Sequence, residues 1–138
     1  NIYIMYTFDK RIPVAIYGAG NTGRQILDYL NESLEYKPYF FIDDNKKLYK
    51  TKVNELYVFN LKDSTRYTEK YGIKTVIIAN PKLSLNLKKS LIKKFEKNNI
   101  DVKTISSNNV FNSKEIISLT KEFILFLGFH FNILLAFE

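Results

Sequence analysis

Short apolar runs and amphipathic stretches alternate along most of this chain. The runs lie at residues 12–17, 39–42, 56–59, 75–79 and 102–105. Runs that are short and apolar at nearly every position are typical of strands buried on both faces of a parallel sheet. We therefore predict five strands.

Helical spacing of apolar residues appears between these runs. The apolar positions are Ile26, Leu27, Leu30 and Leu34, and later Leu87, Leu91, Ile92 and Phe95. The first helix should end near Tyr36, because Pro38 disfavours helical geometry in the residue before it. A second, short helix is predicted at residues 63–71, with Gly72 ending it. No helix fits between the second and third strands.

Alternating strands and helices favour a parallel sheet with helices on both faces. We predict a doubly wound α/β fold in a single domain, with strand order 3-2-1-4-5. Residues 11–107 would form that domain, residues 1–10 a linker or edge segment, and residues 108–138 a C-terminal segment. Because the first residue is Asn1 rather than Met, we expect the chain to be a fragment of a longer protein.

Three glycines follow the first predicted strand, in the sequence VAIYGAGNTGRQIL. In a strand–turn–helix unit, Gly18 would permit the tight turn and Gly20 would let the backbone approach a pyrophosphate. Gly23 would let the helix pack close to the strand. The helix beginning near Asn21 would then offer free N–H groups to phosphates. The pattern is typical of a Rossmann-like nucleotide-binding domain.

Asp43 ends the second strand, 20 residues after Gly23, where a carboxylate can accept hydrogen bonds from ribose hydroxyls. NAD or a related nucleotide is the predicted cofactor, and the alternative is a glycine turn that binds nothing. Arg24 could reach a phosphate, and Asn80 and Pro81 follow the fourth strand at the edge where such sheets bind ligands. The candidate binding residues are Gly18, Ala19, Gly20, Asn21, Thr22, Gly23, Arg24, Asp43, Asp44, Asn80 and Pro81.

Composition narrows the possible partners and chemistry. The net charge is +7, but the lysines at 88–97 fall mostly on the outer face of one predicted helix, so we expect a solvated face and no nucleic-acid partner. The chain has no cysteine and one histidine, His130, which argues against a metal site and suits a reducing, cytoplasmic compartment. A homodimer is a possible assembly of the chain.

The segment at residues 123–137 is strongly apolar but too short to span a bilayer comfortably. A helix packed on the domain or on a partner is the first interpretation. A membrane-surface segment and a truncated end are the alternatives.

Recognisable catalytic motifs are missing from the sequence. There is no GxSxG turn, HExxH pair or P-loop. Tyr6 and Lys10 have the spacing of the short-chain dehydrogenase pair but precede the first strand. We predict no catalytic residue and no metal ligand.

The glycine turn, followed by YKPYFFIDDNK and KTVIIANP, resembles the N-terminal domain of bacterial nucleotide-sugar dehydratases and epimerases of polysaccharide biosynthesis. These proteins include UDP-N-acetylglucosamine 4,6-dehydratase-like and UDP-quinovosamine dehydrogenase-like members. The resemblance covers about residues 11–107. It also accounts for the absence of a predicted helix between the second and third strands. Its motif corresponds to Gly18, Gly20, Gly23, Asp43 and Asp44.

The resemblance implies a longer, membrane-anchored parent whose catalytic domain follows this one, at the cytoplasmic face of the inner membrane. It also implies a ligand that is a dinucleotide, CoA or a UDP-sugar. Two features depart from the family pattern: Asn80 before Pro81, and the apolar tail. We therefore expect a non-catalytic nucleotide-binding domain of a nucleotide-sugar-modifying enzyme, and the alternative is a free-standing nucleotide- or redox-sensing module.

Overall fold

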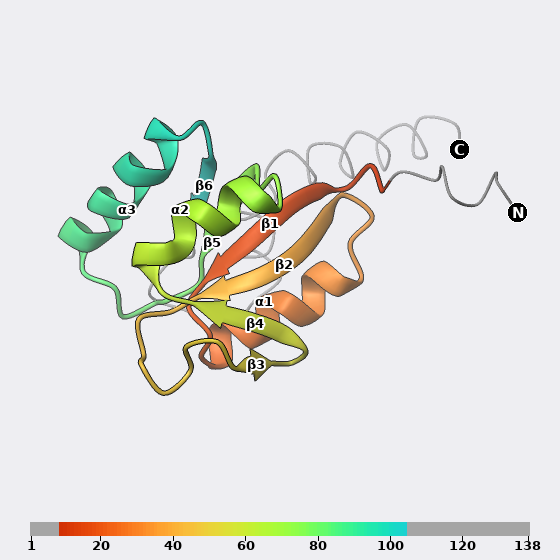
Figure 1. The fold of residues 1–138 in the computed structure, drawn as a ribbon, viewed down its shortest axis with the longest axis horizontal. Helices are drawn as coiled ribbons and strands as arrows, with labels where there is room; N and C mark the ends of the chain where they lie inside the picture. The colour runs from red at the N-terminus through yellow and green to blue at the C-terminus, as the bar shows by residue number, and fades with distance from the viewer. Residues whose placement is uncertain (1–8, 105–138) are drawn as a thin grey trace, which may run out of the picture.

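A six-stranded sheet lies at the centre of residues 9–104, which are the residues that the computed structural model describes (Figure 1). The elements, in chain order, are β1 (Ile12–Tyr17), α1 (Asn21–Asn31), β2 (Tyr36–Ile42), β3 (Lys52–Val53), β4 (Leu56–Phe59), α2 (Leu61–Lys70), β5 (Thr75–Ile78), α3 (Leu85–Lys97) and β6 (Asp101–Thr104). The five predicted strands are all present.

The sheet order is β3-β4-β2-β1-β5-β6. Neighbouring strands from β4 to β6 pair in parallel, whereas β3 pairs antiparallel with β4 at one edge. Without β3 this is the predicted 3-2-1-4-5 order, so the α/β fold class and the topology are confirmed. The predicted absence of a helix between the second and third strands is also confirmed.

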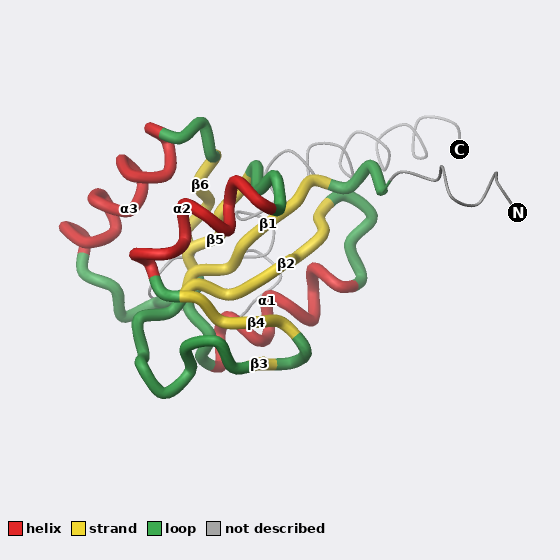
Figure 2. The backbone as a smooth tube through the Cα atoms, in the orientation of Figure 1, coloured by secondary structure: helices red, strands yellow, loops and turns green. Residues whose placement is uncertain are grey.

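Helices cover both faces of the sheet, with α1 on one face and α2 and α3 on the other (Figure 2). Alternation along β1 explains how the two cores form. Val14 and Ile16 pack with the buried leucines of α1, while Ala15 packs with Leu91 and Phe95 of α3. Burial on both faces is the reason that the strands read as continuous apolar runs.

The first helix is shorter than its apolar spacing predicts. It ends at Asn31, and Leu34 is 90% exposed. The hydroxyl of Ser33 accepts hydrogen bonds from the N–H groups of Glu35 and Tyr36, at 3.1 and 3.0 Å, and this turn leads directly into β2. These hydrogen bonds to the Ser33 side chain stabilise a turn, and the helix therefore ends before the apolar spacing does.

Strand β2 therefore begins at Tyr36, three residues before the predicted start, and includes Pro38. The register with β1 shifts between Val14 and Ala15, opposite Pro38 and Phe40. Proline has no N–H to give to the ladder, which suits such an irregularity.

The short strand β3 forms a hairpin with β4, and the apolar pattern of the sequence does not predict this hairpin. Asn54 and Glu55 connect β3 to β4 with φ values of 47° and 72°. Two consecutive positive φ values are the signature of a type I′ turn, which matches the twist of paired strands.

Side-chain caps begin both later helices. Asn60 accepts a hydrogen bond from the N–H of Asp63 at 2.7 Å, so α2 starts two residues before the predicted position. Ser84 accepts one from the N–H of Leu87 at 3.3 Å. Gly72 follows α2 with a φ of 61°, as predicted for its role in ending the helix.

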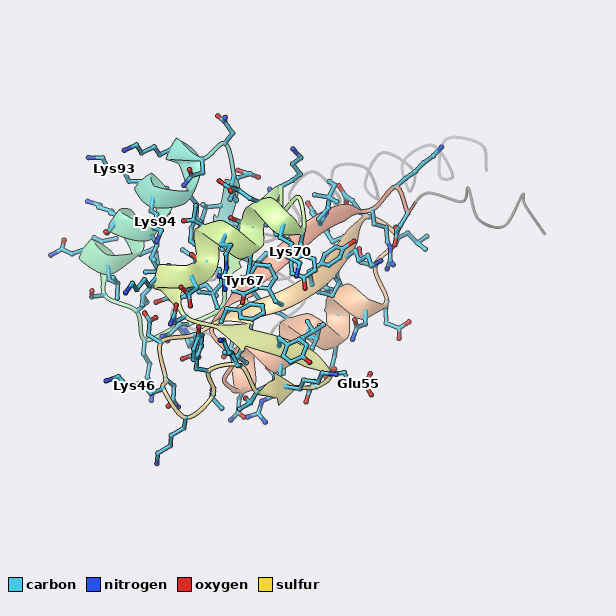
Figure 3. All side chains as sticks on the ribbon, in the orientation of Figure 1. Lys46, Glu55, Tyr67, Lys70, Lys93 and Lys94 are labelled. Carbon is cyan, nitrogen blue, oxygen red and sulfur yellow. The ribbon has the colours of Figure 1, made fainter. Side chains whose placement is uncertain are left out.

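The outer face of α3 carries exposed lysines, among them Lys93 (Figure 3). Lys94 instead donates a hydrogen bond to the carbonyl of Leu61 at 3.1 Å and links α3 to α2. Tyr6, His130 and the apolar tail at residues 123–137 lie outside the described residues. Within residues 9–104, no helix is long and apolar enough to cross a membrane.

Candidate functional site

Three chain segments meet where β1, β2 and β5 end. These strands are parallel neighbours, so their carboxyl ends share one edge of the sheet. The N–H of Gly18 donates to the carbonyl of Ile42 at 2.8 Å, and the N–H of Ala79 donates to the carbonyl of Tyr17 at 2.7 Å. The glycine turn therefore lies between the segments that begin at Asp43 and Ala79.

Two of the glycines are required by the backbone itself. Gly18 has a φ of 109°, and a Cβ there would lie 3.3 Å from the carbonyl carbon and oxygen of Ala79. A Cβ on Gly23 would lie 1.8 Å from the carbonyl oxygen of Gly18. Gly18 thus makes the turn, and Gly23 lets α1 pack against the end of β1.

Gly20 has no such internal reason. Its φ and ψ are −81° and −164°, an extended conformation open to any residue, and a Cβ would meet nothing within 4 Å. The space in front of Gly20 is open, as the close approach of a ligand to the backbone would require.

The same glycine is the N-cap of α1, and it supplies no side-chain hydrogen bond. The first N–H groups of an α-helix have no acceptors within the helix. In α2 and α3 the caps Asn60 and Ser84 provide one, and α2 also has Asp63 in its first turn. The first turn of α1 has no acidic residue, so its positive end is available to an anion.

Asp43 fastens the glycine turn to the end of β2. Its Oδ2 accepts a hydrogen bond from the N–H of Ala19, and its Oδ1 accepts one from the N–H of Asn45, both at 2.9 Å. Each carboxylate oxygen can accept more than one hydrogen bond. Asp43 can therefore hold the turn and still accept hydrogen bonds from a ligand.

The neighbouring Asp44 has a structural task, because its Oδ1 accepts a hydrogen bond from the N–H of Leu61 at the start of α2, at 2.9 Å. Burial raises the pKa of the Tyr17 phenol, and the negative charges of Asp44 and Asp43 raise it further. Tyr17 therefore remains protonated at neutral pH and cannot serve as a base.

Two hollows adjoin Asp43. The larger, of about 390 Å³, is lined by Gly18, Gly20, Asn21, Thr22, Asp43, Ala79, Asn80, Pro81 and Lys82. The smaller, of about 280 Å³, is lined by Asp43, Asp44, Asn45, Lys46, Tyr49 and Asn60. The hydroxyl of Tyr49 donates to the carboxylate of Asp63, which raises the pKa of Tyr49. Since both hollows include Asp43, one ligand could occupy both.

The structure brings most of the predicted residues to the larger hollow. Seven of them line it: Gly18, Gly20, Asn21, Thr22, Asp43, Asn80 and Pro81. Ala19 contributes its N–H to Asp43, Gly23 packs against the turn, and Asp44 borders the smaller hollow.

The side chain of Arg24, which could reach a phosphate from its sequence position, bonds within its own helix start in this structure. Its Nη2 donates to Oδ1 of Asn21 at 2.7 Å, and its Nε contacts the carbonyl of Gly20 at 3.4 Å. The guanidinium thus bonds to its own helix start and does not line the hollow.

Sequence reasoning missed Lys82 in the larger hollow, and Asn45, Tyr49 and Asn60 in the smaller one. A signal for Lys82 existed, because it lies two residues after Asn80 on the loop that leaves β5. No sequence signal indicated Asn60, since it follows β4, a strand that does not border the glycine turn.

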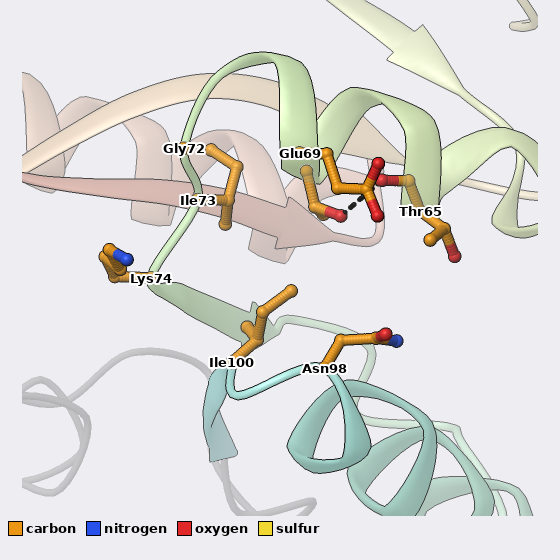
Figure 4. Close-up of a pocket in the computed structure, with 8 residues that line it drawn as sticks. Thr65, Glu69, Gly72, Ile73, Lys74, Asn98 and Ile100 are labelled. Atoms are coloured by element: carbon orange, nitrogen blue, oxygen red, sulfur yellow. Dashed lines mark hydrogen bonds between the residues drawn. The ribbon is translucent and has the colours of Figure 1, made fainter.

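A third hollow, of about 280 Å³, lies near the opposite, amino edge of the sheet (Figure 4). Its lining includes Glu69 of α2, Lys74 before β5, and Asn98 and Ile100 before β6. Gly72, which follows the C-terminus of α2, lines it, but no helix N-terminus does, so the chemistry of phosphate binding points to the carboxyl edge instead. Among the described residues, no group of three or more His, Asp or Glu could hold a metal ion.

Comparison with solved structures finds the UDP-D-quinovosamine 4-dehydrogenase of Vibrio fischeri, which is 35% identical. The match covers 71% of this chain and 80% of that one, with a TM-score of 0.67. The resemblance to N-terminal domains of nucleotide-sugar enzymes is thereby confirmed.

Two structures of RSP, a Rex-family repressor, show the same fold. One is 20% identical over 83% of this chain and 55% of that one, with a TM-score of 0.61. The other, a complex with β-NAD⁺ and operator DNA, is 16% identical over 99% of this chain and 64% of that one, with a TM-score of 0.59.

No curated protein matches the chain. The family profile of the PglD N-terminal domain matches residues 13–94, a span that contains the glycine turn, Asp43 and the Asn80–Pro81 loop. The chain therefore belongs to the PglD N-terminal domain family.

Proposed function

We propose that this domain binds a nucleotide at the carboxyl edge of the sheet and is itself non-catalytic. It would serve a nucleotide-sugar-modifying enzyme of surface polysaccharide biosynthesis, in the cytoplasm or at the cytoplasmic face of the inner membrane. The observation that carries the proposal is Gly20, which caps a helix without a side chain and faces a hollow of about 390 Å³.

The ligand's phosphates would lie against the N-terminus of α1. The N–H groups of its first turn and the helix dipole both favour negative charge there. The nucleoside would extend toward Asp43, whose carboxylate can accept hydrogen bonds from ribose hydroxyls. The smaller hollow, which shares Asp43, would take the rest of the nucleoside.

NAD or a related nucleotide is the proposed cofactor, with CoA and UDP-sugars as alternatives. The relatives support two of these ligand classes: one relative is named for a UDP-sugar, and RSP has been solved with β-NAD⁺ and with β-NADH. The family assignment favours a ligand connected with nucleotide-sugar chemistry.

Reaction chemistry would belong to another part of a parent protein. Two features of the site support this part of the proposal. The Tyr17 phenol is buried and its pKa is raised, and each carboxylate oxygen of Asp43 already accepts a backbone N–H. A nucleotide held here would be positioned but not transformed.

The second candidate function is a sensor of the nucleotide pool, which the fold shared with the RSP repressor favours. A redox sensor must distinguish NADH from NAD⁺, whereas a nucleotide-sugar domain need not. The ratio of the two affinities therefore separates the candidates.

Isothermal titration calorimetry of the whole chain with NAD⁺, NADH, CoA and a UDP-sugar tests the proposal. Saturable binding of at least one of these nucleotides is expected. A large preference for NADH over NAD⁺ would favour the sensor, and the absence of binding by all four would contradict both functions.

A further inference from the structure

The larger hollow has opposite charges on its two sides. Of the residues that line it, Asp43 and Lys82 carry charge. Asp43 follows β2 and Lys82 lies on the loop after β5, and these strands flank β1 on either side. A ligand that crosses the glycine turn from Asp43 therefore meets a cation on the far side.

Lys82 is held in this position by its own loop. Its backbone N–H donates to Oδ1 of Asn80 at 3.0 Å, and the ring of Pro81 fixes φ between the two residues. The N–H of Leu83 donates to the carbonyl of Asn80 at 3.3 Å, and Ser84 then caps α3. The backbone under the lysine is a defined turn, while the side chain is exposed.

Within the part of the chain that the structure describes, the charge of Lys82 takes part in no ion pair. Ion pairs among residues 9–104 join Asp9 to Arg11 and Lys37, and Lys103 to Asp101, and Lys82 belongs to none of them. The other cation near the turn, Arg24, bonds to Asn21 and Gly20. Lys82 is thus the cation that this hollow offers to a ligand.

We infer that Lys82 determines specificity for a second phosphate, and that the site selects nucleoside diphosphates and their derivatives over nucleoside monophosphates. The inference rests on the proposed function. With the ribose at Asp43, the phosphate next to it lies over Gly20 and the first turn of α1. The following phosphate then lies on the β5 side, beside Lys82.

The test compares UDP with UMP and ADP with AMP, because the base is not identified. Each is titrated by calorimetry into the whole chain, the Lys82→Met variant and the Lys89→Met variant. Lys89 is exposed on α3 and lines neither hollow at this edge, so it controls for the loss of one positive charge.

Lys82→Met should weaken diphosphate binding about three- to tenfold, as expected for a partly exposed charge-assisted contact. Monophosphate binding should stay within about twofold, and Lys89→Met should behave as the unchanged chain. The diphosphate preference should also shrink as salt is raised from low to high ionic strength, because the contact is screened.

Equal weakening of monophosphates and diphosphates by Lys82→Met would overturn the inference, and so would an unchanged preference. In both cases binding by the unchanged chain would leave the proposed function standing. If the unchanged chain bound none of the four nucleotides, the inference would fail, whereas the proposed function is decided separately by the titrations with NAD⁺, NADH, CoA and a UDP-sugar.

Discussion

At the scale of single residues, the three glycines of the turn have different physical reasons to be glycine. Gly18 needs its positive φ, and Gly23 has the Gly18 carbonyl where a Cβ would stand. Gly20 needs neither, which agrees with the proposed approach of a ligand to its backbone. The same substitution should therefore destabilise the domain much more at Gly23 than at Gly20.

Gly23→Ala should destabilise the domain by about 1–3 kcal/mol, because the new methyl group overlaps a backbone carbonyl that cannot move freely. Gly20→Ala should lower the free energy of unfolding by less than about 1 kcal/mol, because the methyl group enters open space and only the preference for glycine at the N-cap is lost. Urea denaturation of both variants measures the difference. Equal stability would mean that α1 does not pack against the turn as described.

Asp43 should discriminate against a phosphate on the ribose. If a dinucleotide binds, NAD⁺ should bind more tightly than NADP⁺, because the carboxylate repels a 2′-phosphate. Asp43→Asn should reduce this preference, and its remaining side-chain oxygen can still accept one of the two backbone N–H groups. Tighter binding of NADP⁺ by the unchanged chain would show that a nearby cation such as Lys46, which lines the smaller hollow together with Asp43, overrides the carboxylate.

Sequence patterns predicted the residues of the larger hollow better than the direction of their long side chains. The order of strands brings Gly18, Asp43 and Asn80 to one edge whatever their rotamers. Arg24 and Lys82 are long and flexible, so their sequence positions allow several contacts. Arg24, which could reach a phosphate from its sequence position, bonds to Asn21 in this structure, whereas Lys82 lines the hollow.

At the scale of elements, α3 shows how burial divides an amphipathic helix. Leu91 is 1% exposed and packs against one face of the sheet, whereas Leu87 is 43% exposed near the start of the helix. Both belong to the apolar spacing that predicted the helix. The pattern alone does not reveal that the first turn extends beyond the core.

Leu91→Ala should therefore lower the free energy of unfolding by about 2–5 kcal/mol, since it leaves a cavity in the core. Leu87→Ala makes the same chemical change at a half-exposed position and should cost less than about 1 kcal/mol. Chemical denaturation of the pair provides the measurement. A larger loss at Leu87 would contradict the placement of α3.

The elements that the sequence did not predict depend on local interactions. Nothing in the apolar spacing ends α1 before Leu34, because the signal is the Ser33 hydroxyl acting on two following N–H groups. Strand β3 has two residues, too few for any periodicity, and its hairpin turn is formed by Asn54 and Glu55 without glycine. Long buried runs such as β5 were found because burial on both faces leaves little ambiguity.

At the scale of the whole molecule, the proposed function is that of a domain that would hold a nucleotide without transforming it. We expect the chain to show no dehydratase, epimerase or dehydrogenase activity with UDP-N-acetylglucosamine and NAD⁺. A placed acid–base group typically contributes about 10²–10⁴-fold to such reactions. Product analysis and the absorbance of reduced cofactor provide the assay.

Turnover above background that survives repurification, and that is lost in Tyr6→Phe, would contradict the non-catalytic assignment. That variant addresses the Tyr6–Lys10 pair, whose spacing matches a dehydrogenase motif. Turnover that persists in Tyr6→Phe would point to a different catalytic group and contradict the assignment equally.

We propose that the open space at Gly20 is a nucleotide-binding site, and the Gly20→Val variant is designed to block it. Valine fits the extended backbone of this position and meets no protein atom near its Cβ, so the fold should persist with at most the loss of about 1 kcal/mol expected at an N-cap. Its branched side chain would occupy the place of the phosphates. Calorimetric titration should therefore show binding of NAD⁺, CoA or a UDP-sugar by the unchanged chain and none by the folded variant. Equal nucleotide affinity in the unchanged chain and the folded variant would rule out a binding site at Gly20.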